Sequence, residues 1–154
     1  MGIDRKELTI ASAILAKAGI ADCDAAMLSP LTLAYIGDSV FELIVRRIVL
    51  KRTRMPSGKM HQEVTGIVCA GSQAQIGRLI RPLLTPEEDA VYRRGRGAKP
   101  DHTAKNASRR DYLEATALEA LIGYLYLNRR YKRLAGLIRA GLEMKDGING
   151  KTED

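Results

Sequence analysis

Apolar residues recur along this chain every three or four positions, the spacing that gathers them on one face of an α-helix. Cap-forming residues precede the apolar runs, and glycine or proline follows most of them. The pattern predicts helices over about residues 5–18, 30–52, 58–70, 73–81, 86–94, 109–128 and 131–144. No alternating run typical of a strand competes with them, so the predicted fold class is all-α.

Several predicted helix starts carry capping residues. Asp4 and Glu7 form a capping-box pair for the first helix. The expected N-caps of the later helices are Ser29, Ser57, Ser72, Thr85 and Ser108. The helical pattern breaks over residues 95–106, where glycines and a proline predict a long loop.

The composition is that of a single globular domain. With 154 residues, 45% of them hydrophobic, the chain has the size of one globular domain, expected over residues 1–144 with a flexible tail over 145–154. No apolar run approaches the roughly 18 residues of a membrane span. Cys23 and Cys69 lack the spacing of a disulfide framework or a zinc site, which predicts two reduced, buried thiols. We therefore expect a cytoplasmic protein with neither a membrane nor a small-molecule cofactor as partner.

Charge indicates the class of partner. The 25 Lys and Arg residues exceed the 18 Asp and Glu residues, which gives a net charge of +7. Such an excess favours a polyanion, and nucleic acid is the first candidate. With no Trp and one Phe, stacking on single-stranded bases is poorly supported. A duplex recognised through its phosphates, 2′-hydroxyls and shape fits better.

Two acidic residues lie on helix faces that are otherwise apolar. At 100° per residue, Asp38 and Glu119 each share a face with mainly hydrophobic side chains. No Lys or Arg stands three or four positions from either acid, so neither has a cation on its own helix. Glu114, in contrast, falls on the opposite face from Glu119, where we expect solvent.

Glycines inside the same helices suggest a close crossing. Gly37 and Gly123 each cost about 1 kcal/mol relative to alanine, and close approach of a second backbone is the usual reason. If the helices cross there, Asp38 and Glu119 converge, and a carboxylate pair without an ammonium partner suits Mg²⁺. The alternative is that each acid meets an arginine from elsewhere or lies at a solvated edge.

Glu42 is a third acid that could take part, because it follows Asp38 by one helical turn. Arg46 stands four residues further on, in the favourable order for an ion pair along a helix. An ordinary structural pair therefore explains Glu42 better than catalysis does.

Basic residues concentrate in two segments. Residues 46–59 contain no acid, and residues 93–110 contain only Asp101. Glycines in the second segment would let main-chain amides approach phosphates, which makes it the better candidate contact. The alternative for either segment is that its basic residues only keep the protein soluble and bind no nucleic acid.

Three stretches resemble a known family. Residues 33–42, LAYIGDSVFE, resemble the signature helix of the ribonuclease III family, and residues 117–127, ALEALIGYLYL, resemble its second acidic motif. RGRGAK at 94–99 and AKN at 104–106 look like the basic loop of the mini-ribonuclease III branch, a catalytic domain without the usual double-stranded-RNA-binding domain. The resemblance covers about residues 28–142 and leaves no room for a second domain.

The resemblance implies an all-α homodimer that binds double-stranded RNA and cleaves both strands with Mg²⁺, leaving 5′-phosphates and short 3′ overhangs. The branch looks like a maturation enzyme for the ends of large-subunit (23S) ribosomal RNA precursor. Asp38 matches the signature aspartate and Glu119 the second-motif glutamate, so both would be catalytic and hold the metal. The basic loop would contact phosphates through Arg94, Arg96, Lys99 and Lys105, and the minor groove through Asn106.

The chain departs from ribonuclease III proper at two acidic positions, where it has Ala34 and Thr116. The mini branch shows the same reductions. Gly97 stands where the branch often has Asn.

Two functions of other classes remain as alternatives. One is a non-catalytic double-stranded-RNA-binding ribosome-assembly factor on the same fold, although a binder gains nothing from uncompensated carboxylates near phosphates. The other is a DNA-binding helical regulator, which would need a helix-turn-helix that we do not find.

Overall fold

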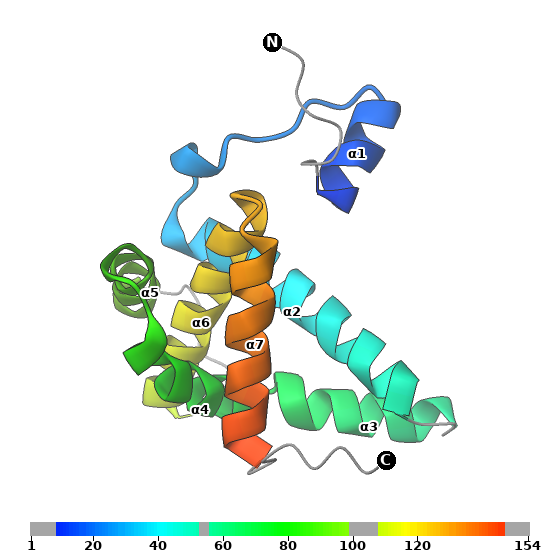
Figure 1. Cartoon of the computed structure of the whole chain (residues 1–154), viewed down its shortest axis with the longest axis vertical. Helices are drawn as coiled ribbons and strands as arrows, with labels where there is room; N and C mark the ends of the chain where they lie inside the picture. The colour runs from blue at the N-terminus through cyan, green and yellow to red at the C-terminus, as the bar shows by residue number, and fades with distance from the viewer. Residues whose placement is uncertain (1–8, 53–55, 99–107, 147–154) are drawn as a thin grey trace.

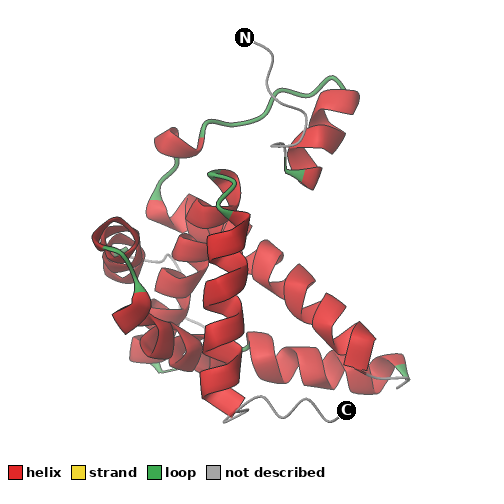
Figure 2. Ribbon diagram, in the orientation of Figure 1, coloured by secondary structure: helices red, strands yellow, loops and turns green. Residues whose placement is uncertain are grey.

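The computed structural model describes residues 9–52, 56–98 and 108–146, and every regular element in these ranges is helical (Figures 1 and 2). This confirms the all-α class. The elements are α1 (Ile10–Lys17), η1 (Ala25–Met27), α2 (Pro30–Arg52), α3 (Ser57–Val68), α4 (Ala70–Ile80), η2 (Arg81–Leu83), α5 (Pro86–Gly97), α6 (Arg109–Leu127) and α7 (Tyr131–Asp146).

Helices α2 and α6 form the centre of the molecule. They pack against each other more extensively than any other pair, and α4 and α5 pack on the remaining faces of α6. Helix α7 lies across α4 and α6, while α3 packs against α2 and α4 (Figure 1). Helix α1 stands apart from this bundle in Figure 1. The core is a continuous cluster of side chains from α2 to α7, including Phe41, Ile76, Tyr92, Leu121 and Leu137.

Two glycines let α2 and α6 touch through their backbones. A Cβ built on Gly37 would overlap the main-chain oxygen of Glu119 and lie 2.8 Å from the nitrogen of Gly123. A Cβ on Gly123 would overlap the main-chain oxygen of Leu33. No side chain fits either position without displacing a backbone, so the predicted close crossing is confirmed.

Three of the predicted caps are confirmed. Ser29 and Ser108 accept hydrogen bonds from the main-chain nitrogens of Thr32 and Asp111. Thr85 forms a full capping box with Glu88.

The structure corrects two caps and one helix start. Ser57 is the first residue of α3, after Pro56, and Ser72 lies buried inside α4, because the extended backbone of Cys69 alone separates α3 from α4. Helix α1 begins after Thr9, whose side chain accepts from the nitrogen of Ser12, so it is shorter than predicted. Asp4 and Glu7 lie outside the described residues.

Helices α5 and α7 run further than the pattern predicted. Gly95 is helical because α6 packs closely against it: a Cβ there would lie 2.8 Å from the Cβ of Ala120. Helix α5 therefore continues to Gly97 instead of ending near Arg94. Helix α7 ends at Asp146, two residues beyond its predicted end.

Across the described ranges, no helix combines the length and apolar character that a bilayer span requires.

Cys23 and Cys69 are free and both are exposed, so the prediction of buried thiols was wrong. Each lies at a junction between elements instead of on a core-facing helix position.

Candidate active site

Asp38 and Glu119 lie together at the crossing of α2 and α6. Asp38 follows Gly37, and Gly37 faces the main-chain oxygen of Glu119. The two carboxyl groups are close enough for the charge of Asp38 to raise the pKa of Glu119. The conditional prediction that these acids converge if the helices cross at their glycines is therefore confirmed.

The surroundings of this pair raise the pKa of both acids. Burial raises the pKa of Glu119 to about 8, with repulsion from Asp38 as the second cause. Burial also raises the pKa of Asp38, and the charge of Glu42 adds to the effect. No lysine or arginine among the described residues offsets either shift, so the alternative of a compensating arginine finds no support. A cation bound between two neighbouring carboxylates would stabilise both as anions.

Glu42 forms the helical ion pair that its spacing predicts. Its Oε1 lies 2.6 Å from a guanidinium nitrogen of Arg46, and both side chains are solvent-accessible. Across the described parts of the chain, no three His, Cys, Asp or Glu side chains gather closely enough to form a larger metal cluster. The site therefore offers two protein carboxylates, from Asp38 and Glu119.

Packing residues occupy the two positions where ribonuclease III proper carries further acids. Ala34 is buried against Val91 and Ala120. The Thr116 hydroxyl donates to the main-chain oxygen of Tyr112 at 2.9 Å, within its own helix. Neither residue offers the site a charged ligand.

Sequence reasoning missed a third residue at this site, Gln73 of α4. It is only 2% exposed, its Nε2 donates to the main-chain oxygen of Val68 at 2.8 Å, and its proximity lowers the pKa of Glu119, against the larger effect of burial. Gln73 shares a helical face with Ile76 and Ile80, which are buried core residues. That spacing was the available signal, because a polar residue on a core-facing stripe needs a buried partner.

The five residues predicted to contact RNA differ in their surroundings. Arg94 is exposed on α5. Arg96, in contrast, forms an ion pair with Glu114, with 2.7 Å between Nε and Oε1. Lys99, Lys105 and Asn106 lie outside the described residues.

Glu114 is buried, so its prediction as a solvated residue was wrong. It is 4% exposed and accepts a hydrogen bond of 2.5 Å from the Tyr92 hydroxyl. Gly77 makes room for that contact, since a Cβ there would lie 2.5 Å from the hydroxyl oxygen. Helices α4 and α5 thus cover the face of α6 that helical geometry alone assigned to solvent.

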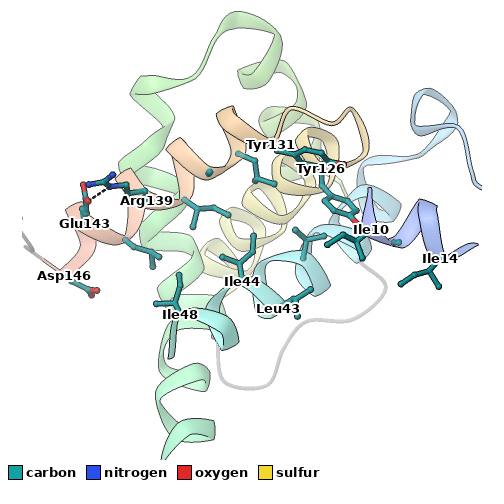
Figure 3. A pocket seen from close by; sticks show the side chains of 16 residues that line it. Ile10, Ile14, Leu43, Ile44, Ile48, Tyr126, Tyr131, Arg139, Glu143 and Asp146 are labelled. Carbon is teal, nitrogen blue, oxygen red and sulfur yellow. Dashed lines mark hydrogen bonds and ion pairs between the residues drawn. The ribbon is translucent and has the colours of Figure 1, made fainter. Parts of the chain in front are cut away.

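An apolar groove lies beside α2 and α7, away from the carboxylate pair. It has a volume of about 1070 Å³ and its lining is almost entirely hydrocarbon. Figure 3 shows Leu43, Ile44 and Ile48 of α2 along it, with Ile10 and Ile14 of α1 at one end. Ile10 is 81% exposed and Leu43 is 64% exposed, so this surface has no partner within the described part of the chain.

Comparisons with known proteins agree with this geometry. The Ribonuclease III domain family matches residues 31–130. The chain is 40% identical over 116 residues to Mini-ribonuclease 3 of Symbiobacterium thermophilum, covering 75% of this chain and 89% of the relative. It is 45% identical over 113 residues to Mini-ribonuclease 3 of a Synechocystis strain, covering 72% and 78%. A crystal structure of a Fusobacterium nucleatum protein superposes with a TM-score of 0.72 at 27% identity, covering 84% of this chain and 100% of that one.

Proposed function

Because this chain belongs to the ribonuclease III family, whose members are endoribonucleases acting on double-stranded RNA, we propose that Asp38 and Glu119 form its Mg²⁺ site. The observation that carries the proposal is the close carboxylate pair, with Asp38 exposed and Glu119 half-buried, and with no described basic side chain to neutralise it. A binding protein has no use for such a pair next to RNA, whose phosphates it would repel.

The residues present fit a hard divalent cation. Mg²⁺ is commonly held by one or two carboxylates, with waters and substrate phosphates as its other ligands. The cation supplies charge stabilisation at a phosphodiester and activation of water for hydrolysis. Asp38 and Glu119 would hold it from two helices whose spacing is fixed by the contacts at Gly37 and Gly123. At neutral pH the raised pKa of Glu119 couples cation binding to release of a proton.

We place the RNA duplex against the C-terminal end of α5, where the basic residues of this helix gather. Arg94 would contact phosphate, and Lys99, Lys105 and Asn106 of the following segment would extend the contact. The Glu114 ion pair gives Arg96 a structural role at the base of this segment, in addition to any phosphate contact.

A second copy of the chain is the partner we propose for the apolar groove. Exposed apolar surfaces on this scale are characteristic of subunit interfaces. A homodimer would bring two carboxylate pairs to one duplex and allow both strands to be cut, leaving 5′-phosphate ends. Leu43→Asp should convert the dimer to a monomer in sedimentation experiments, whereas a monomeric wild-type protein would contradict this assignment.

The cellular substrate we propose is the large-subunit (23S) ribosomal RNA precursor, in the cytoplasm. The support is the similarity to relatives named Mini-ribonuclease 3 and the net charge of +7, which favours a polyanionic partner. Mapping the ends of this RNA in cells depleted of the protein tests it. Unprocessed ends are expected, and correctly matured ends would refute the substrate assignment.

The decisive experiment separates binding from cleavage. Asp38→Asn should lower the cleavage rate of a duplex by about 100-fold or more, since ligand loss exceeds the cost of removing a supporting residue. Its affinity for the same duplex, measured in Ca²⁺, should stay within about threefold of wild type. Glu63→Gln, an exposed acid on α3, is the matched control. Full cleavage by Asp38→Asn would refute the site.

A further inference from the structure

Glu114 of α6 is a buried carboxylate whose two oxygens contact side chains of α5. The Tyr92 hydroxyl donates to Oε2 at 2.5 Å, and Nε of Arg96 lies 2.7 Å from Oε1. Burial and the hydrogen bond to Glu114 both raise the pKa of Tyr92, so its hydroxyl stays protonated and remains a donor. Each carboxylate oxygen thus has its own partner, and the two partners lie one helical turn apart on α5.

Gly95 lets the last turn of α5 lie directly against α6. A Cβ at this position would lie 2.8 Å from the Cβ of Ala120 and 3.0 Å from the Cα of Ala117. Any larger residue would push the two helices apart. The close approach brings Arg96, the next residue of α5, within reach of Glu114.

The ion pair of Arg96 and Glu114 is buried on its acidic side only. The Arg96 side chain remains 44% exposed, and the contact with Glu114 is made through Nε. The two Nη groups of a guanidinium carry four further donors. A stabilising role alone explains this pair poorly, because apolar residues of similar volume often stabilise a protein as well as a buried ion pair does. An exposed guanidinium edge held from behind by a buried acid is suited to binding a phosphate.

Arg78 of α4 provides a contrast. It also pairs with an acid of α6, with Nη2 lying 2.5 Å from Oδ1 of Asp111. The Asp111 side chain is 33% exposed, so its charge would face any phosphate that approached Arg78 and would repel it. Glu114 is covered and holds Arg96 without presenting its own charge to a ligand.

We propose that Glu114 is a positioning residue for RNA binding, whose carboxylate fixes the Nε edge of Arg96 so that the Nη groups face a backbone phosphate of the duplex. The role rests on the proposed binding of double-stranded RNA at the C-terminal end of α5. An acid then contributes to recognition of a polyanion, because it orients a cation and does not itself face the RNA. The role is independent of the metal site at Asp38 and Glu119.

The first test replaces the guanidinium with a single ammonium. Arg96→Lys keeps the charge and an ion pair with Glu114, but a paired ammonium has no second edge for a phosphate. In Ca²⁺, it should bind double-stranded RNA about tenfold more weakly than wild type, with the log–log salt dependence flatter by about one unit. Arg78→Lys, which also keeps an ion pair to α6, is the matched control and should bind as wild type does. Wild-type affinity and slope in Arg96→Lys would overturn the proposal.

The second test removes the charge of the acid and keeps its shape. Loss of an acid ordinarily strengthens the binding of a polyanion, since repulsion falls. Glu114→Gln should instead weaken duplex binding by about threefold or more, because a neutral amide holds Arg96 less firmly. Glu63→Gln, at an exposed position of α3, should bind as tightly as wild type or slightly more tightly. Equal or tighter binding by folded Glu114→Gln would overturn the proposal.

Two controls separate this role from folding and from the metal site. Thermal unfolding identifies folded variants, and Arg96→Lys decides the question if Glu114→Gln does not fold. In cleavage assays Arg96→Lys should raise KM more than it lowers kcat, and the reverse would overturn the proposal. If wild type binds no duplex, the RNA surface and the role of Glu114 fail together. If Asp38→Asn cleaves fully, the metal site fails, and the binding results still decide the role of Glu114.

Discussion

Removing the charge of Glu119 should make the metal-free protein more stable at alkaline pH. The pKa of Glu119 is raised from 4.5 to about 8, so the folded state binds this proton more tightly than the unfolded state does. The stability contributed by the protonated group is complete below pH 4.5, declines as pH rises, and is lost above about pH 8. At pH 9 the folded protein must therefore hold an unfavourable, half-buried anion at Glu119.

The size of the effect follows from the shift. At 1.36 kcal/mol per pKa unit, the shift of Glu119 corresponds to about 5 kcal/mol, which is an upper value because local relaxation and water entry reduce it. Glu119→Gln keeps the shape of the side chain and removes the charge. We expect it to stabilise the protein by about 2–5 kcal/mol at pH 9, which for a chain of this size raises Tm by roughly 5–15 °C. At pH 5 the two proteins should unfold within about 2 °C of each other.

The assay is thermal unfolding followed by circular dichroism in EDTA at both pH values. Glu63→Gln controls for the loss of an exposed acid and should leave Tm nearly unchanged at each pH. Adding Mg²⁺ at pH 9 should stabilise wild type more than Glu119→Gln, because only wild type retains the full carboxylate pair. A Glu119→Gln protein that is equally or less stable than wild type at pH 9 would refute the reasoning.

Three further predictions concern packing and RNA binding. Gly37→Ala forces a methyl group into the backbone of α6 and should lower the free energy of unfolding in urea by about 3 kcal/mol or more. The control Gly66→Ala, in open space on α3, should raise it by about 0.5–1 kcal/mol. Similar effects at both positions would contradict the close crossing of α2 and α6. Arg96→Ala leaves the buried Glu114 carboxylate without its cation and should lower the free energy of unfolding by about 2–4 kcal/mol in the same assay. An unchanged free energy of unfolding would show that this ion pair does not stabilise the fold. Replacing Lys99 and Lys105 with alanine should flatten the log–log salt dependence of duplex affinity by about one unit each, and an unchanged slope would move the RNA surface elsewhere.

The central crossing could be predicted from the sequence because its signals are local. Each acid, Asp38 or Glu119, stands among apolar residues at helical spacing within one segment of the sequence. Gly37 and Gly123 lie in the same two segments. The contacts at Gly37 and Gly123 confirmed this part of the prediction.

Glu114 and Gln73 could not be placed in the same way, because their surroundings come from other helices. The helical wheel of α6 does not include α5, which covers Glu114 with Tyr92 and Arg96. Gln73 depends on the position of the Val68 carbonyl, which a reading of α4 alone does not contain. Periodicity defines which face of a helix is apolar, while tertiary packing decides which polar residues join it.

Cleavage of an end-labelled double-stranded RNA by the purified protein tests the central claim most directly. The reaction is run with Mg²⁺, with Mn²⁺, with EDTA, and with Asp38→Asn as the control for contaminating ribonuclease. Internal cuts that require both the divalent cation and Asp38 are expected. Tight binding of several duplexes without cutting under any of these conditions would contradict it and favour a non-catalytic role in ribosome assembly.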